Sequence, residues 1–469
     1  MPPVFSPEEA KMKYISTRGK TEPVGFKDAV MMGLAEDGGL LLPEKIPALT
    51  KDELKAMSKM TYPELAFAVL SKFADDIPAN DLKELINKSY ASFDTPEVAP
   101  VIKKGELFVQ ELFHGPTFAF KDVALQLLGN LFEYILKERG EKLNIIGATS
   151  GDTGSAAIYG VRGKDNINIF ILHPKGRVSR VQKMQMTSVT DENVFNVAIN
   201  GTFDDCQDIV KAIFADVEFK KQNKLGAVNS INWARVLAQV VYYFYGYFRA
   251  QEQGAEKIRF VVPTGNFGNI FAGYFAMRMG LNIDKLILAT NANNILSRFI
   301  NDGDYSTKEV VITHSPSMDI QIASNFERYL YFLYGENPAK VVEKMAELKT
   351  TGKITFTDKE IKDTQKLFGT FSASNILTET VIQYFYNTFK YILDPHTACG
   401  VGAALEFHDA DYICLSTAHP AKFPEVAEKA AGVKPAVPSG ISQLEDLPKK
   451  CILMDNDIDK VKKYLADNI

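Results

Sequence analysis

The chain has 469 residues, more than a single hydrophobic core usually serves, so we expect two or three domains. Its 46% hydrophobic and 24% charged residues are typical of a globular protein and argue against disorder or a fibrous repeat. A net charge of −5 argues against the broad positive surface that nucleic acids and anionic membranes require. The four cysteines are dispersed, so we expect neither a metal site nor a disulfide framework. Motifs for ATP-binding P-loops, NAD and zinc proteases are missing from the sequence.

The first hundred residues mix turn-rich and amphipathic helical sequence and end in a proline-containing linker, which indicates an N-terminal subdomain over residues 1–100. The N-terminal stretch MPPVFSPEEAKMKY has acidic residues and prolines where a secretory signal would have an apolar core. No later apolar run reaches membrane-spanning length. We therefore expect a cytoplasmic protein with no membrane partner.

From about Leu107, short apolar β-runs alternate with helical patterns. The runs NIIGA, NINIFILHP, NVFNVAI, KIRFVVP and DKLILAT each lie near a helical stretch. This alternation predicts an α/β fold with mostly parallel sheets covered by helices. Over 318–391 the β-runs almost vanish in favour of aromatic-rich helical sequence, so we expect a helical insertion there and a last α/β stretch at 392–469.

Lys121 is the first candidate functional residue. It follows an aromatic loop with Phe113, Phe118 and Phe120 and precedes an amphipathic helix. An apolar setting favours the neutral amine, the form that attacks a carbonyl or accepts a proton. The alternative is a solvated lysine at the start of a helix, and this segment taken alone favours that alternative.

Two further segments place a glycine-containing loop between a β-run and a helix. The candidate residues in these loops are Thr149, Ser150, Asp152 and Thr153 in the first, and Gly265, Asn266, Phe267, Gly268 and Asn269 in the second. Glycines let backbone N–H groups approach a ligand, and a helix N-terminus adds partial positive charge, so both loops suit a carboxylate or a phosphate. Ordinary capped helices are the alternative for both.

A fourth segment, YICLSTAHPAKF, ends a β-run with Ser416 and Thr417. Ligands gather at the carboxyl ends of parallel strands, so a hydroxyl there could face a heterocycle. The alternative is a simple cap after the strand, with His419 and Lys422 as surface residues.

Taken together, these segments resemble the threonine synthases. The motifs are Phe-His-Gly-Pro-Thr-x-x-Phe-Lys-Asp at 113–122, Thr-Ser-Gly-Asp-Thr-Gly-Ser-Ala, Gly-Asn-Phe-Gly-Asn and Ser-Thr-Ala-His-Pro-Ala-Lys-Phe. Tyr-Ile-Ser-Thr-Arg-Gly at 14–19 and Asp-Gly-Gly-Leu-Leu-Leu-Pro at 37–43 extend the resemblance over nearly the whole chain. One departure is a short extra segment before Met12.

The resemblance implies the fold type II of pyridoxal-phosphate enzymes, with the cofactor held between two open, mostly parallel α/β sheets. The N-terminal subdomain and the helical insertion resemble the longer bacterial and fungal branch. On this basis we expect a core at 101–317 that includes a smaller, mobile α/β domain at about 122–235, with 392–469 completing the large domain.

The resemblance also implies roles for the candidate residues. Lys121 would be the catalytic residue and carry pyridoxal 5'-phosphate as a Schiff base. Residues 265–269 would hold the cofactor phosphate, and Thr417 would bond the pyridine nitrogen. Thr149, Ser150, Asp152 and Thr153 would grip the substrate carboxylate. Candidates for the substrate phosphate are Asn229, Asn232, Arg235, Arg180 and Lys183.

The implied reaction converts O-phosphohomoserine and water into threonine and phosphate by β,γ-elimination and replacement, the last step of threonine biosynthesis. One alternative is a threonine-synthase-like phospho-lyase or a dehydratase that ends at 2-oxobutyrate. Another is a cofactor-free binding protein on the same scaffold. We expect a small-molecule substrate, no nucleic-acid partner, and a monomer, with a homodimer as the alternative.

Overall fold

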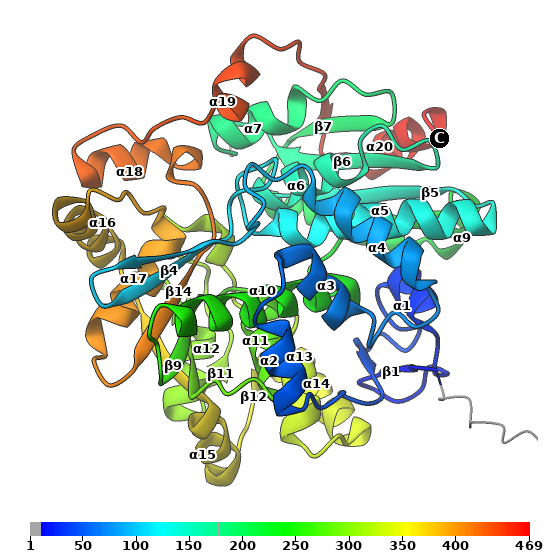
Figure 1. Cartoon of the computed structure of the whole chain (residues 1–469). Helices are drawn as coiled ribbons and strands as arrows, with labels where there is room; N and C mark the ends of the chain where they lie inside the picture. The colour runs from blue at the N-terminus through cyan, green and yellow to red at the C-terminus, as the bar shows by residue number, and fades with distance from the viewer. Residues whose placement is uncertain (1–10, 177) are drawn as a thin grey trace, which may run out of the picture.

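The computed structural model describes residues 11–176 and 178–469. The short extra segment before Met12 and most of the stretch MPPVFSPEEAKMKY lie outside the described residues. Two α/β units and an N-terminal unit make up the described chain (Figure 1). Among the helices in these ranges, none is long and apolar enough to cross a membrane.

The larger α/β unit contains a six-stranded sheet with the order β13–β10–β9–β14–β4–β3. Its strands are β3 (Val101–Lys104), β4 (Leu107–Glu111), β9 (Ile258–Pro263), β10 (Lys285–Thr290), β13 (Phe368–Ser372) and β14 (Asp411–Ser416). Neighbouring strands are parallel except β3, which pairs antiparallel with β4 at one edge. This topology places the ends of β4, β9 and β14 next to one another.

Helices cover both faces of this sheet, which explains why its central strands are continuous apolar runs. The helices are α10 (Trp233–Glu252), α11 (Gly268–Arg278), α12 (Ile295–Asp302), α16 (Asn375–Phe389), α17 (Pro395–Glu406) and α18 (Pro424–Ala431). Along β9, Phe260 and Val262 join the core that includes α10 and α11, whereas Val261 joins the core that includes α16 and α17. Successive side chains of a strand point to opposite faces, so each face buries alternate residues.

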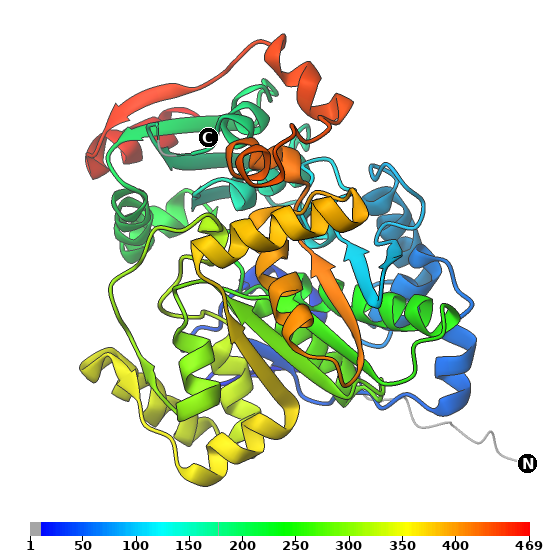
Figure 2. The ribbon, with the colours of Figure 1, turned by 90° about the vertical axis from the view of Figure 1, so that its left-hand side faces the viewer.

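The smaller α/β unit contains a five-stranded, wholly parallel sheet with the order β15–β7–β6–β5–β8. Its strands are β5 (Leu143–Ala148), β6 (Ile167–Pro174), β7 (Val194–Asn200), β8 (Leu225–Gly226) and β15 (Ile452–Asp455). Its helices are α5 (Lys121–Arg139), α6 (Asp152–Val161), α7 (Arg180–Thr187), α8 (Phe203–Ala215), α9 (Val217–Gln222) and α20 (Ile458–Asp467). The two sheets lie one above the other in Figure 2.

The helices α5 and α6 approach each other closely at two glycines. A Cβ atom on Gly129 would lie 1.9 Å from the carbonyl oxygen of Gly160, a separation that no side chain tolerates. These glycines therefore let the backbones meet. The close packing fixes the first residue of α5, Lys121, relative to the first residue of α6, Asp152.

The N-terminal unit packs against α10 through aromatic side chains. It contains the hairpin β1 (Tyr14–Ser16) and β2 (Leu41–Pro43) and the helices α1 (Phe26–Met32), α2 (Lys51–Met57), α3 (Tyr62–Leu70) and α4 (Ala79–Tyr90). Tyr14 and Phe73 contact the buried indole ring of Trp233, with ring centroids 6.3 and 6.5 Å away. Capping boxes at Thr50 and Thr61 begin α2 and α3.

The remaining elements lie outside the two main sheets and their covering helices. They are β11 (Tyr305–Ser306), β12 (Lys353–Ile354), α13 (Phe326–Leu333), α14 (Pro338–Thr351), α15 (Asp358–Leu367), α19 (Ser439–Ser442) and the 3-10 turns η1 (Pro316–Met318), η2 (Pro420–Lys422) and η3 (Gln443–Glu445). Among them, α13 and α15 contact α11 and α12 of the large unit.

The predicted α/β class is confirmed, but two sequence-based assignments need correction. The end of 392–469 does not belong to the large unit, because β15 pairs parallel with β7 in the smaller sheet. The helical insertion at 318–391 contains β13, which pairs with β10 at the edge of the large sheet. Both are short edge strands, and their sequence pattern does not specify a partner. The mobility of the smaller unit stays a prediction.

Candidate functional site

Three of the four sequence segments meet at the carboxyl ends of strands in the six-stranded sheet. The strand β4 leads to Lys121, β9 leads to the loop 265–269, and β14 leads to Thr417. A backbone hydrogen bond of 2.9 Å from the N–H of Phe120 to the carbonyl of Thr417 joins the first and last of these. Ligands bind at this edge of parallel sheets, so these loops form the candidate site.

Lys121 begins α5, and its side chain is only 12% exposed. Its Nζ lies 5.8 Å from the ring centroid of Phe120 and 3.7 Å from Oδ2 of Asp152. Burial lowers the pKa of Lys121 to about 8, with Asp152 opposing this shift and Lys422 and Arg235 adding to it. The lysine therefore has the buried setting that the aromatic loop predicts, and part of it is neutral near pH 7.

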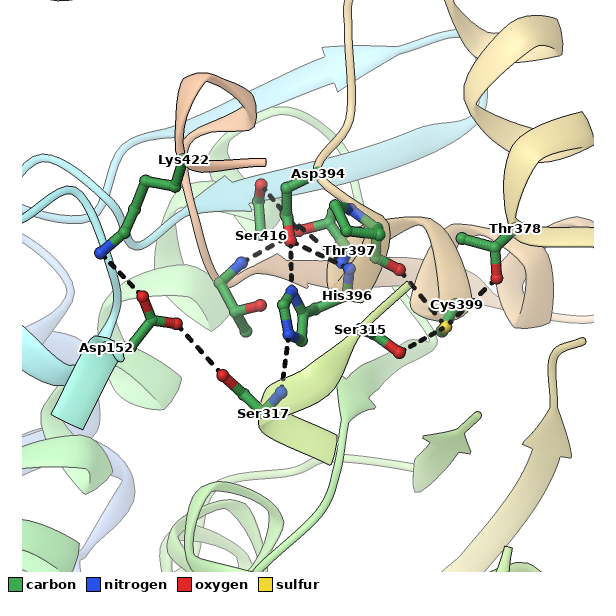
Figure 3. A network of polar contacts seen from close by, with 12 residues as sticks. Asp152, Ser315, Ser317, Thr378, Asp394, His396, Thr397, Cys399, Ser416 and Lys422 are labelled. Atoms are coloured by element: carbon green, nitrogen blue, oxygen red, sulfur yellow. Dashed lines mark hydrogen bonds and ion pairs between the residues drawn. The ribbon is translucent and has the colours of Figure 1, made fainter. Parts of the chain in front are cut away.

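Asp152 begins α6 and connects the two α/β units. Its Oδ1 accepts hydrogen bonds from Nζ of Lys422 and Nε2 of Gln182, both at 2.8 Å. Its Oδ2 accepts one from Oγ of Ser317 at 3.2 Å, so that Asp152 lies between Lys422 and Ser317 (Figure 3). Burial alone would raise the pKa of Asp152, but the charges of Lys422 and Lys121 hold it well below its usual range. An ionised carboxylate repels a substrate carboxylate, so only the backbone N–H of Asp152 suits the expected role.

Lys422 lies in η2, directly after β14, and is completely buried. Besides Asp152, its Nζ contacts the carbonyl oxygen of Thr117 at 2.7 Å. The interpretation of Lys422 as a surface residue is therefore wrong. Nothing in its local sequence signals burial, because η2 is too short for a periodic pattern.

A buried network supports Thr417 from behind. Asp394 accepts hydrogen bonds from Oγ1 of Thr397 and from Nδ1 of His396, the latter at 2.9 Å. Oγ1 of Thr397 then accepts from the N–H of Thr417 at 3.0 Å. Nε2 of His396 accepts from the N–H of Ser317 at 3.3 Å, so its proton resides on Nδ1. This network fixes the end of β14 and ties it to η1 (Figure 3).

The loop 265–269 turns sharply from β9 into α11. Phe267, the residue before α11, has a φ of +63°, and its ring packs against Phe326 at a centroid distance of 5.5 Å. Within the described part of the chain, the backbone N–H groups of 265–269 have no hydrogen-bond acceptor. Unpaired N–H groups at a helix N-terminus fit a phosphate.

Asn269 adds a side-chain donor to this loop. Its Oδ1 accepts from the hydroxyls of Tyr242 and Tyr243 at 2.6 and 2.9 Å, which fixes the orientation of the amide. Its Nδ2 is buried and has no partner among the described residues. The two tyrosines therefore hold an unpaired N–H pair in place.

Arg235 and Asn232 lie near each other in sequence but differ in what they offer a ligand. Arg235 is 4% exposed, and its Nε and Nη1 have no partner among the described residues. Burial lowers the pKa of Arg235 to about 10. Asn232 caps α10 by accepting from the N–H of Ala234 at 3.0 Å, and its Nδ2 donates to the carbonyl of Val30 at 2.8 Å. An anion would supply the partner that the guanidinium of Arg235 lacks. The amide of Asn232 already has hydrogen-bond partners within the protein, so we drop Asn232 from the candidates.

The loop after β5 has both braced and unpaired groups. Oγ1 of Thr149 accepts from the N–H groups of Gly151 and Gly154 at 3.0 and 2.9 Å, so this hydroxyl braces the turn. The hydroxyls of Ser150 and Thr153 are half-buried and make no hydrogen bond within residues 11–176 and 178–469. Ser150 and Thr153 are therefore the side chains of this loop that can bind a ligand.

The other candidates for the substrate phosphate lie away from these loops or are engaged. The side chain of Arg180 is 73% exposed and pairs with Glu445 at 2.8 Å. Lys183 is exposed as well. Oδ1 of Asn229 accepts from the backbone N–H of Asn232 at 3.0 Å. Among the sequence candidates for the substrate phosphate, Arg235 alone is both buried and unpaired.

Sequence reasoning missed Gln182, Ser317, Asp394 and His396. A signal existed for Gln182, because Ser179 and Gln182 form a capping box at the start of α7. Ser317 and His396 follow no pattern, since they depend on contacts between distant segments. In the described ranges, no group of three His, Cys, Asp or Glu side chains is arranged to hold a metal ion.

Comparisons with known proteins agree along nearly the whole chain. Family models match residues 13–90 (threonine synthase N terminus), 94–415 (pyridoxal-phosphate dependent enzyme) and 397–465 (threonine synthase, C-terminal). A threonine synthase from Pseudomonas aeruginosa is 46% identical over 465 residues, covering 97% of this chain and 98% of its own. A threonine synthase-like 2 from Xenopus laevis is 35% identical, covering 98% and 99%.

A solved structure extends this agreement to three dimensions. The crystal structure of pyridoxal-phosphate-bound threonine synthase from Brucella melitensis matches with a TM-score of 0.94 at 46% identity, covering 98% of this chain and 99% of that one. The fold type II expected from the resemblance is confirmed by these matches. The chain therefore belongs to the threonine synthase family of pyridoxal-phosphate-dependent enzymes.

Proposed function

We propose that the protein is a threonine synthase that converts O-phospho-L-homoserine and water into L-threonine and phosphate, with pyridoxal 5'-phosphate as its cofactor. The observation that carries this proposal is a buried lysine amine, Lys121, in a site whose anion-binding groups are unpaired. The relative named threonine synthase is 46% identical to this chain, against 35% for the one named threonine synthase-like 2, which favours the synthase.

The residues of the loop 265–269 fit the cofactor phosphate. Gly265, Asn266, Phe267, Gly268 and Asn269 would hold it through unpaired N–H groups at the start of α11. The end of β14 supplies Thr417, whose hydroxyl would face the ring nitrogen. When bound at Lys121, pyridoxal phosphate supplies an electron-accepting ring that stabilises negative charge on substrate carbons.

The proton transfers would fall to Lys121. With a pKa of about 8, its amine both accepts and returns protons near neutral pH. The hydroxyls of Ser150 and Thr153 and the N–H of Asp152 would hold the substrate carboxylate at the start of α6. Arg235 would bind the substrate phosphate through its unpaired guanidinium nitrogens.

The test is product analysis of the purified protein with pyridoxal phosphate and O-phosphohomoserine. Phosphate, threonine and 2-oxobutyrate are measured in the same reaction. We expect equal amounts of threonine and phosphate. Phosphate with 2-oxobutyrate would instead reassign the chain as a phospho-lyase. If no phosphate is released, O-phosphohomoserine is not the substrate.

A Lys121→Ala variant separates an enzyme from a binding protein on this scaffold. We expect the unaltered protein to hold the cofactor covalently, so that borohydride reduction fixes it to the peptide that contains Lys121. The variant should lose this adduct and fall in activity by at least about 10³-fold, because it lacks both the nucleophile and the base. Covalent attachment at another lysine would remove Lys121 from its role.

We also propose a cytoplasmic monomer. All four cysteines are free, as expected in a reducing compartment. Sedimentation should give a mass near the 52.2 kDa of one chain, whereas twice that value would mean a homodimer.

A further inference from the structure

Two lysines share the carboxylate of Asp152. The nearer one is Lys422, whose Nζ lies 2.8 Å from Oδ1, and the other is Lys121, whose Nζ lies 3.7 Å from Oδ2. The side chain of Lys422 has no exposed surface, so water does not screen its charge. A buried ammonium group is costly unless a charged partner compensates it, and Asp152 is that partner.

Lys422 also holds the loop that carries Lys121. Its Nζ donates to the carbonyl of Thr117 at 2.7 Å, and Nε2 of Gln185 donates to the same oxygen at 3.0 Å. Lys422 comes from the large α/β unit and Asp152 from the smaller one, so a single ammonium group joins both units and the Lys121 loop.

The charges around Lys121 come from several elements. Asp152 on α6 favours its ammonium form, whereas Lys422 on η2 and Arg235 on α10 favour the neutral amine. Asp122, the next residue on α5, is buried and bonded to Thr117. Without Lys422, Asp152 would face Lys121 as its nearest cation and would hold the amine in the protonated form, which accepts no proton.

We propose that Lys422 is a positioning residue of the site, whose buried ammonium group fixes the Asp152 carboxylate and offsets its charge so that Lys121 stays available as a neutral amine. The consequence for turnover rests on the proposed function. The effect on the Lys121 amine does not, and it is measured separately.

The experiment measures the pKa of Lys121 by competitive labelling with trace acetic anhydride and mass spectrometry. It uses the full-length chain after removal of pyridoxal phosphate, and each sample must regain the absorbance of the bound cofactor when it is added back. The variants are Lys422→Met and Lys422→Gln. The glutamine keeps an N–H donor for Asp152 and serves if the methionine variant does not fold.

Asp152→Asn tests the sign of the effect, and Lys344→Met is the matched control. Lys344 is 8% exposed and contacts one carboxylate, Glu347 at 2.9 Å, and one carbonyl, Thr355 at 2.6 Å. It therefore has the same kinds of partner as Lys422, but it lies on α14, well below α6 in Figure 1.

We expect the Lys422 variants to raise the pKa of Lys121 by about one pH unit, Asp152→Asn to lower it, and Lys344→Met to leave it unchanged. In the enzyme loaded with cofactor, kcat should fall at low pH, and in the Lys422 variants the midpoint of this fall should move to higher pH by a similar amount. The proposal is overturned if the Lys422 variants leave the pKa of Lys121 unchanged, or if they and Asp152→Asn shift it in the same direction. If the unaltered protein forms no threonine, the proposed function is wrong, but the labelling result for Lys121 is unaffected.

Discussion

The loops that follow β5 and β9 have similar sequences but opposite electrostatic roles. Both run from an apolar strand through glycines into a helix N-terminus. The loop after β9, 265–269, keeps its N–H groups unpaired in the described part of the chain and adds the free Nδ2 of Asn269. The loop after β5 contributes its own anion, Asp152, which two lysines already neutralise.

The comparison shows that a glycine-containing loop before a helix does not by itself specify an anion site. The first turn of α6 carries a carboxylate, whereas the first turn of α11 carries the amide of Asn269. The outcome depends on that one side chain and on distant partners such as Lys422. The predictions below test each loop in turn.

The largest effect should come from removing the charge of the first loop. Asp152→Ala leaves Lys422 buried without a counter-ion, so we expect a loss of about 3–5 kcal/mol in the free energy of unfolding. Urea unfolding of the cofactor-free protein measures it. Asp216→Ala is the control, because Asp216 caps α9 and pairs with Lys462 at 2.6 Å but is 40% exposed. That variant should lose clearly less stability, because solvent screens an exposed pair. Equal losses of stability in the two variants would mean that the buried ion pair contributes no more than the exposed one.

A buried charge without a partner should respond in the opposite way when it is removed, and Arg235 on α10 is such a charge. Arg235→Met takes away a buried guanidinium that has no partner among the described residues, so the cofactor-free protein should keep or gain stability. The affinity for O-phosphohomoserine should fall about 10-fold to 100-fold, a loss of roughly 1.4–3 kcal/mol. Thermal unfolding and a titration with the substrate measure the two effects.

Arg180→Met is the control for Arg235→Met. Both arginines were sequence candidates for the substrate phosphate, but the side chain of Arg180 is 73% exposed and pairs with Glu445. We expect Arg180→Met to leave the affinity for O-phosphohomoserine unchanged. If Arg235→Met destabilised the cofactor-free protein, the guanidinium would have a structural partner and the contrast with the paired charge of Asp152 would fail.

Most of this site follows from the sequence, but the ion pair at its centre does not. The β-runs NIIGA and KIRFVVP lie within one residue of β5 and β9, because a buried parallel strand needs a continuous apolar run. Local patterns also place Lys121 and the loop 265–269 at helix starts. Lys422 meets Asp152 only after β14 and α6 have assembled from segments 270 residues apart, roughly, and no local pattern encodes such a contact.

The same reasoning explains the errors in the fold. Four residues of β15 and five of β13 pair with strands that lie far away in sequence. Short edge strands lack the long apolar run that marks a central strand. Helical sequence on both sides hides β13 further. Edge pairing is decided by tertiary packing, which a local pattern does not contain.

A smaller effect should come from the shape of the second loop. A Cβ on Gly265 would lie 3.1 Å from the carbonyl oxygen of Ser317, tighter than an ordinary contact with a backbone atom. Gly265→Ala should therefore shift the loop and weaken pyridoxal-phosphate binding by about tenfold, roughly 1.4 kcal/mol. Equilibrium dialysis measures the affinity. Gly147→Ala, in β5, is the matched control, since its Cβ would meet only Ile171 at 3.7 Å. Equal affinities in both variants would contradict a close-fitting loop.

The smallest expected effect contrasts two buried aspartates. The charges of Lys422 and Lys121 hold the pKa of Asp152 low, whereas burial raises the pKa of Asp122 to about 6 despite its hydrogen bonds from Thr117 and the charge of Lys422. At pH values between the ordinary pKa of about 4 and this raised pKa, Asp122 is protonated in the folded protein more often than in the unfolded chain. Its contribution to stability is therefore present at low pH and is lost as the pH rises through 6.

Asp122→Asn tests this contrast, because an asparagine can accept from the N–H of Thr117 and donate to its hydroxyl. The unaltered protein should lose stability relative to the variant between pH 4 and 6.5, by on the order of 1 kcal/mol, since the fold relaxes around the ionised carboxyl. Urea midpoints across this range give the difference. A constant difference would mean that the pKa of Asp122 is the same in the folded and the unfolded chain, and the contrast with Asp152 would then fail.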